Sequence, residues 1–176
     1  MDSGEADFKK EVLMINEKMQ EAINRQINRE FYSAYLYLSM ASYFEWVNLK
    51  GFAHWMRFQS KEEIEHAMKL YDYLVKRRGR VFLSEIESPP SEWKSPLAAF
   101  EQTYKHEKNV TEMINHLVKL AKKESDPATE VFLQWFISEQ AEEEKSSNEI
   151  LQRLKLTGDA HDELFILDQE LSKRYS

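Results

Sequence analysis

Glycine and proline, the residues that most often interrupt helices, are so rare in this chain that four long stretches contain neither. The 176 residues include only four glycines and four prolines, against average usage of about 7% and 5%. The uninterrupted stretches are 16–50, 52–78, 97–126 and 128–157. At about 1.5 Å per residue, such helices are rods of roughly 40 to 45 Å, which are stable in water only when they pack side by side.

The ends of these stretches carry residues that begin and end helices. Ser95-Pro96 and Asp126-Pro127 each place a capping side chain before a proline at the first helical position. Arg77-Arg78-Gly79 has the pattern of a basic last turn followed by a glycine stop. These signals predict four separate helices rather than one continuous coil.

The lengths of the connections predict the topology. The joints at 48–51 and 123–127 are short, so each joins an antiparallel pair of helices. The segment 79–95 is long enough to run the length of a bundle. The predicted fold is therefore all-α, a four-helix bundle with one long crossover.

The two ends of the chain differ in character. We expect a short fifth, C-terminal helix over about 160–174, because its leucines fall along one stripe. Residues 1–15 are charged and lack such a stripe, so we expect a flexible N-terminal extension before a single bundle domain over 16–176. The leucines of the fifth helix are Leu164, Leu167 and Leu171.

Composition limits the partners and the location. The formal net charge is −7, with 24 basic and 31 acidic residues, and there is no basic block of the kind that binds nucleic acid. No apolar run approaches the roughly 20 residues that cross a bilayer. The N-terminal residues are acidic and no apolar segment follows them, so we expect no secretory signal. We therefore expect a cytoplasmic protein without a nucleic-acid or membrane partner. Because the chain has no cysteine, oxygen and imidazole are the ligands expected at any metal site.

Every one of the four predicted helices carries a carboxylate in the row that faces the core. A buried carboxylate costs several kcal/mol unless it is paired or bound to a metal, so four that meet in one bundle would repel one another. A pair of divalent cations resolves this conflict. The four rows are Ile23, Ile27, Glu30, Ala34, Tyr37 and Ala41; Met56, Gln59, Glu63, His66, Leu70 and Leu74; Phe100, Thr103, Glu107, Val110, Ile114 and Leu117; and Leu133, Phe136, Gln140, Glu143, Ile150 and Leu154.

The spacing of these polar residues repeats along the chain. The interval from Glu30 to Glu63 equals the interval from Glu107 to Gln140. Corresponding positions in the two halves are therefore related by one constant offset. The chain is thus typical of a duplicated helical hairpin, with a quasi-twofold site for two metal ions at its centre.

Each residue taken singly has an ordinary explanation. His66 alone would more often be a hydrogen-bonded core histidine, and Tyr37 plain core packing. The acidic run 142–144 would usually be a solvated face. The combination of carboxylates on four stripes with matched spacing is what favours a di-metal centre.

Three stretches carry a resemblance to a known family: 28–37 (NREFYSAYLY), 62–67 (EEIEHA) and 132–144 (FLQWFISEQAEEE). Over about 14–174 the chain resembles the non-haem ferritins of bacteria and archaea, which belong to the ferritin-like di-iron carboxylate superfamily. The resemblance implies an iron-storage and detoxification protein, a ferroxidase that oxidises Fe(II) to Fe(III) with O2 or hydrogen peroxide. It also implies a hollow homo-oligomeric shell of twenty-four subunits in which a ferric oxide mineral is deposited.

The resemblance assigns ligands by position. Glu30, Glu63 and His66 would bind one iron. Glu63 would bridge to a second iron, which Glu107 and Glu143 would hold. These five residues form the expected ferroxidase centre.

The resemblance assigns further roles around that centre. Gln140 is expected beside the position of dioxygen, and Tyr37 matches the tyrosine of the centre. A third iron site is expected on the side that faces the cavity, with Glu143 shared. Its remaining ligands would be Glu62, Glu139 and Glu142.

Related proteins with other chemistry fit the sequence less well. Bacterioferritin has a second Glu-x-x-His on its fourth helix and an axial methionine after the bridging glutamate, whereas this chain has Gln140-x-x-Glu143 and Ile64. No haem is therefore expected. A rubrerythrin-like peroxidase needs paired cysteines, which are absent. A purely structural bundle with solvated acidic residues stays open as an alternative, and it would bind and oxidise no Fe(II).

Overall fold

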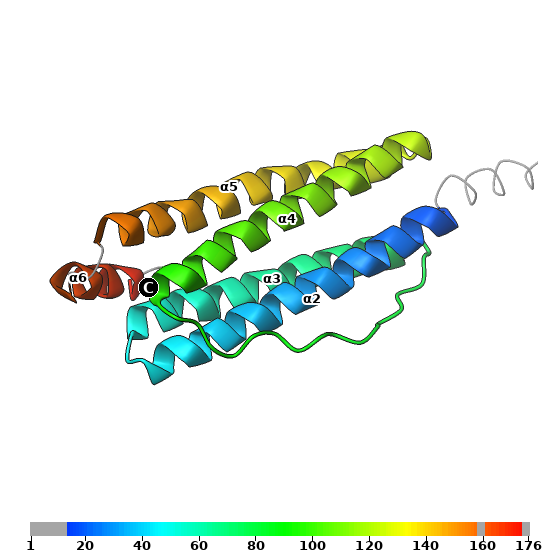
Figure 1. Ribbon diagram of the computed structural model, residues 1–176. Coiled ribbons are helices and arrows are strands. Elements are labelled where there is room, and N and C mark those ends of the chain that lie inside the picture. The colour runs from blue at the N-terminus through cyan, green and yellow to red at the C-terminus, as the bar shows by residue number, and fades with distance from the viewer. Residues whose placement is uncertain (1–13, 158–160, 174–176) are drawn as a thin grey trace, which may run out of the picture.

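The computed structural model describes residues 14–157 and 161–173, and Figure 1 shows them as a bundle of helices. Two antiparallel pairs, α2 with α3 and α4 with α5, lie against each other, and α6 packs at one end. The segment between α3 and α4 runs along the bundle as a long strap. The helices are α2 (Glu17–Trp46), α3 (Lys50–Lys76), α4 (Pro96–Lys123), α5 (Pro127–Thr157) and α6 (His161–Leu171). The predicted four-helix bundle with one long crossover and a short fifth helix is confirmed.

In three helices, the side chain of the residue just before the helix caps its start. Asn16, Ser95 and Asp126 each accept a hydrogen bond from the backbone N–H three residues further on, at 2.9 to 3.1 Å. Each such cap stabilises its helix by about 1 kcal/mol. The predicted caps at Ser95 and Asp126 are confirmed.

Three helices are followed by a residue in the left-handed conformation, whose own N–H and that of the next residue donate back to carbonyl oxygens of the last turn. Asn48, Arg78 and Ser125 have φ angles of 62°, 56° and 55°. The interval from Asn48 to Ser125 equals the interval between the starts of α3 and α5, at Lys50 and Pro127. The backbone therefore repeats at the offset inferred from the sequence.

Two glycines lie where the chain packs closely, and Gly79 also closes the end of α3 by donating its N–H to the carbonyl oxygen of Leu74 at 2.9 Å. Arg78 takes the left-handed position expected of Gly79, and a Cβ at Gly79 would lie 2.5 Å from Leu74 Cδ1. The prediction that Gly51 belongs to a joint is wrong, because it lies inside α3. A Cβ there would lie 1.6 Å from the carbonyl oxygen of Asp168, so only glycine lets α6 approach α3 at this point.

The core follows the predicted rows, since every residue in them is buried. Two apolar clusters fill the two ends of the bundle. The polar residues of the rows lie between these clusters and form a belt at mid-height. No helix among the described residues is long and apolar enough to span a membrane.

The predicted extension at 1–15 falls mostly outside the described residues. Ile15, near its end, is buried and donates its N–H to the carbonyl oxygen of Arg77 at 3.0 Å. Ile15, predicted to belong to the extension, is therefore part of the packed bundle. At the other end, the buried Leu167 and Leu171 of α6 extend the core, as their stripe predicted.

Candidate metal centre

Four buried carboxylates meet in the polar belt, one from each long helix. Glu30, Glu63, Glu107 and Glu143 are all at most 4% exposed. His66 lies one turn after Glu63 on α3 and is equally buried. The charges of Glu30, Glu107 and Glu143 all act on Glu63, which places it at the centre of the set.

One group within the belt can hold a metal ion. Ligand atoms of Glu30, Glu63 and His66 lie within 4.8 Å of one another. Glu30 Oε2 and Glu63 Oε1 are buried and accept no hydrogen bond from the described residues. A buried carboxylate oxygen without a hydrogen-bond donor destabilises the fold. A cation between these two oxygens would remove that cost.

Burial raises the pKa values of three carboxyl groups in the belt. Burial raises the pKa of Glu30, although the hydrogen bond from Gln26 opposes the rise. Burial and the neighbouring charges of Glu107 and Glu30 raise the pKa of Glu63 well above its usual range. Burial also raises the pKa of Glu107 to about 7. At neutral pH the belt is therefore partly protonated, and a bound cation would displace those protons.

A second group shares the histidine with the first. Ligand atoms of His66, Glu139 and Glu143 also lie within 4.8 Å of one another, and His66 Nε2 is 4.0 Å from Glu139 Oε1. The other ring nitrogen, Nδ1, is 3.3 Å from Glu63 Oε2. Burial and the charge of Lys69 lower the pKa of His66 to about 4. The imidazole is therefore neutral near pH 7, the state that can ligate a metal.

Hydrogen bonds hold Glu107 in place from two other helices. The hydroxyl of Tyr37 on α2 donates to Glu107 Oε1. The amide of Gln140 on α5 donates to Glu107 Oε2 at 3.1 Å. Burial and the charge of Glu107 raise the pKa of Tyr37 well above its usual value, so the phenol keeps its proton and stays a donor.

Comparison with known proteins shows the family to which the chain belongs. The family described as Ferritin-like domain matches residues 20–157. A bacterial non-heme ferritin from Bacteroides fragilis is 44% identical over 161 residues, which cover 92% of this chain and 100% of that protein. The chain belongs to the ferritin family. A bacterial non-heme ferritin from Escherichia coli is 38% identical over 159 residues, with coverage of 90% and 96%.

A solved ferritin structure agrees with the fold. An open-pore ferritin from the hyperthermophilic archaeon Archaeoglobus fulgidus matches with a TM-score of 0.90 and 58% identity, over 91% of this chain and 98% of that chain. The predicted resemblance to non-haem ferritins is thus confirmed at the level of family and fold.

The residues predicted for a third site in this ferritin are only partly brought together. Glu62 and Glu139 line one pocket of about 450 Å³ beside His66, on the side formed by α3 and α5. The side chain of Glu142 is 75% exposed and lies 4.0 Å from Lys145. Glu142 belongs to neither candidate metal group, so its part in a third site stays a prediction.

Two glutamines that contact the belt were not predicted as site residues. Gln26 Nε2 donates to Glu30 Oε1 at 2.8 Å, and Gln59 Nε2 donates to Glu143 Oε2. Both glutamines are at most 4% exposed. Their position four residues before a core glutamate, Glu30 or Glu63, is a signal in the sequence that could have found them.

Proposed function

We propose that this ferritin stores and detoxifies iron by oxidising Fe(II) at the buried belt and passing Fe(III) to a mineral inside a hollow shell. The observation that carries the proposal is the group of Glu30, Glu63 and His66, in which two buried carboxylate oxygens have no donor. Membership of the ferritin family supports iron as the metal.

Each ligand has a distinct part in this proposal. Glu30, Glu63 and His66 bind the first Fe(II), and Glu63 reaches across to a second. Glu107 and Glu143 hold the second ion. Carboxylates are hard donors that favour Fe(III) over Fe(II), so the ligand set would make bound Fe(II) easier for O2 or peroxide to oxidise.

The protons and electrons of the reaction balance. Two Fe(II) ions lose one electron each, and O2 takes up both electrons with two protons to leave as hydrogen peroxide. A peroxide molecule takes two electrons and two protons from a further pair of Fe(II) ions and leaves as two water molecules. Glu107, whose pKa is about 7, is suited to release a proton as the cation binds.

The residues around the centre control geometry and exit. Tyr37 and Gln140 fix the orientation of Glu107 by donating to its two oxygens. His66 faces Glu139 through its second ring nitrogen. We propose that Glu139, with Glu62 and Glu142, forms a third iron site on the way from the centre to the mineral.

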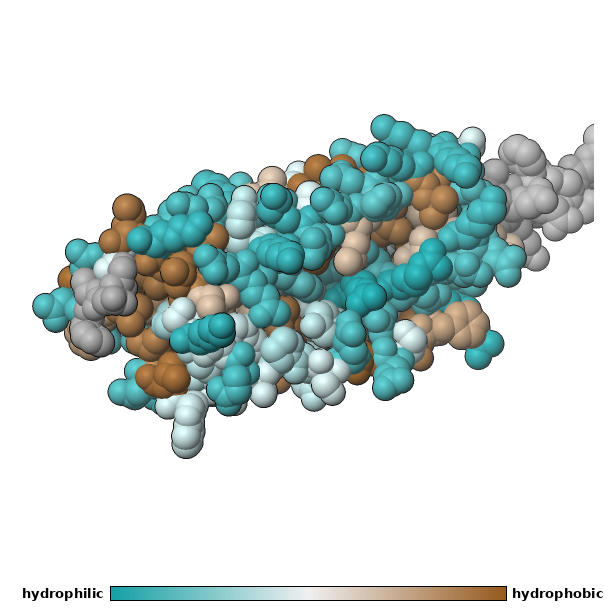
Figure 2. Space-filling model, viewed as in Figure 1, coloured by the Kyte–Doolittle hydropathy of each residue, from teal (hydrophilic) through white to brown (hydrophobic). Residues whose placement is uncertain are grey.

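We further propose that the chain assembles as a homo-oligomer, a shell of twenty-four subunits. Several large apolar side chains lie exposed on the single chain. Monomeric proteins rarely expose a large contiguous apolar patch. Trp46 and Leu156 are each 86% exposed, and Phe165 is 63% exposed. Figure 2 shows hydrophobic side chains gathered at the end of the bundle that carries α6.

Haem has no part in this proposal. The position after Glu63 is Ile64, which offers no axial sulfur, and Glu143 stands where a second histidine would be needed. The relatives named above are non-heme ferritins.

Anaerobic titration with Fe(II), followed by exposure to O2, tests the function. We expect two tightly bound Fe(II) ions per chain and their rapid oxidation with a transient visible absorption. A chain that binds no Fe(II) and oxidises none would instead be the structural bundle that the sequence left open.

A further inference from the structure

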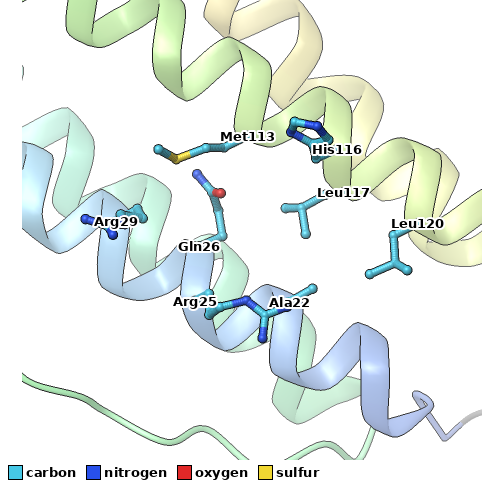
Figure 3. A pocket seen from close by; sticks show the side chains of 8 residues that line it. All are labelled: Ala22, Arg25, Gln26, Arg29, Met113, His116, Leu117 and Leu120. Carbon is cyan, nitrogen blue, oxygen red and sulfur yellow. The ribbon is translucent and has the colours of Figure 1, made fainter.

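The pocket lined by Glu62 and Glu139, between α3 and α5, is called the Glu139 pocket. A second pocket, of about 300 Å³, opens between α2 and α4 (Figure 3). Its deep part is lined by the buried Gln26 and Leu117, and its rim by the exposed Arg25, Arg29 and His116. We call it the Gln26 pocket. None of the roles assigned so far uses it.

Gln26 connects this pocket to the belt. Its Nε2 donates to Glu30 Oε1 at 2.8 Å, so the pocket is one hydrogen bond away from a proposed iron ligand. Its Oε1 accepts no hydrogen bond from any part of the chain that the structure describes. Figure 3 shows the amide group between the two helices, facing Met113 and Leu117 of α4. An unpartnered acceptor on a side chain only 4% exposed is a place for a hydrogen-bond donor.

The charges around the pocket distinguish it from the Glu139 pocket. Among the described residues no carboxylate lines the Gln26 pocket, and its rim carries Arg25 and Arg29, whose partners Glu21 and Glu87 lie outside the lining. The Glu139 pocket, by contrast, contains several carboxylates and a single lysine. A divalent cation is attracted to the acidic pocket and repelled by the basic one, whereas an uncharged molecule is indifferent to both.

We infer that the Gln26 pocket binds hydrogen peroxide and admits it to the belt, while Fe(II) uses a different route. An O–H group of peroxide donates to Gln26 Oε1, and Nε2 of the same amide keeps its bond to Glu30. Dioxygen has no proton to donate and gains nothing from this acceptor. The inference rests on the proposed function, because it supplies the oxidant that removes electrons from two Fe(II) ions.

Filling the pocket tests this inference. Met113→Trp places a large side chain in the pocket, and the matched control Glu112→Trp places one on the adjacent exposed surface of α4. Protein loaded with Fe(II) under anaerobic conditions is mixed rapidly with hydrogen peroxide or, separately, with O2. We expect Met113→Trp to lower kcat/KM for peroxide about five- to tenfold. The rate with O2 and the anaerobic affinity for Fe(II) should match those of Glu112→Trp.

The outcomes separate the two proposals. Peroxide kinetics equal to those of the control would overturn the role of the pocket, and an equal fall with both oxidants would overturn the selection of peroxide. Failure of the wild-type protein to bind or oxidise Fe(II) would overturn the proposed function instead. If Met113→Trp does not fold, His116→Trp narrows the same pocket from its exposed rim and carries the same expectations.

Discussion

At the scale of single residues, the raised pKa values of the belt predict how stability depends on pH. A carboxyl group whose pKa is raised by folding binds more protons folded than unfolded, so the free energy of unfolding falls as the pH rises. Burial lowers the pKa of His66 and His106 to about 4, and these two groups act in the opposite direction, between about pH 4 and 6.5. The histidine contribution fades by about pH 7.5, once the unfolded histidines have lost their protons. Above that pH the belt dominates, because folding raises the pKa of Glu107 to about 7 and that of Glu63 well above normal.

The metal-free protein should therefore lose stability as the pH rises from about 7.5 to 9. Denaturant unfolding at a series of pH values measures this slope. Saturation with Zn(II), which would neutralise the belt, should flatten or reverse it. If the metal-free protein becomes more stable over this range, the belt carboxyl groups do not bind more protons in the folded than in the unfolded protein.

The bridging role proposed for Glu63 makes a second prediction at this scale. Glu63→Gln keeps the shape and replaces a carboxyl group that must hold a proton when buried by an amide that is always neutral, so the metal-free variant should be as stable as the wild type or more stable. Fast oxidation of Fe(II) should fall at least tenfold, because both ions lose a ligand. Rapid-mixing oxidation beside thermal melting checks both parts. Glu101→Gln on the exposed face of α4 is the matched control, and wild-type oxidation by Glu63→Gln would remove Glu63 from the centre.

At the scale of helices, the sequence predicted the inward rows and the antiparallel pairs, but not which side chains of different helices bond to one another. Each inward row follows from heptad periodicity, a local property, and every residue in the four rows is buried. The bond from Gln59 on α3 to Glu143 on α5 depends on which side chains meet at one height, which no single helix specifies. The place of Gly51 was missed for the same reason, because the backbone of α6 that requires it comes from the far end of the chain.

The contact between α3 and α6 gives a prediction for a whole element. Asp168 Oδ1 accepts hydrogen bonds from the N–H groups of Gly51 and Phe52, at 2.8 and 3.0 Å, and so caps the start of α3. Asp168→Ala should cost about 1 to 3 kcal/mol, since it leaves two buried donors unpaired. Gly51→Ala should cost at least as much, because its Cβ would clash with the α6 backbone.

Denaturant unfolding together with amide hydrogen exchange at 50–52 measures this effect. Asp162→Ala, at an exposed position in the first turn of α6, should leave both the stability and the exchange unchanged. Unaltered protection of 50–52 in Asp168→Ala would show that α6 does not cap α3.

At the scale of the whole molecule, the exposed apolar residues predict assembly. Sedimentation of the purified protein should show one large closed species, and electron microscopy should show a hollow centre. Trp46→Glu tests whether exposed aromatic surface drives assembly, because a charge there should shift the population towards small oligomers. Monomers or dimers alone in the wild-type protein at working concentration would rule out the shell.

The central claim is that the belt at mid-height of the bundle holds two iron ions, and anomalous diffraction at the iron edge tests it most directly. Crystals soaked with Fe(II) under anaerobic conditions should show two peaks per chain. One should lie among Glu30, Glu63 and His66, and the other beside Glu63 towards Glu107 and Glu143. Peaks confined to surface carboxylates such as Glu142, with none in the belt, would contradict the account.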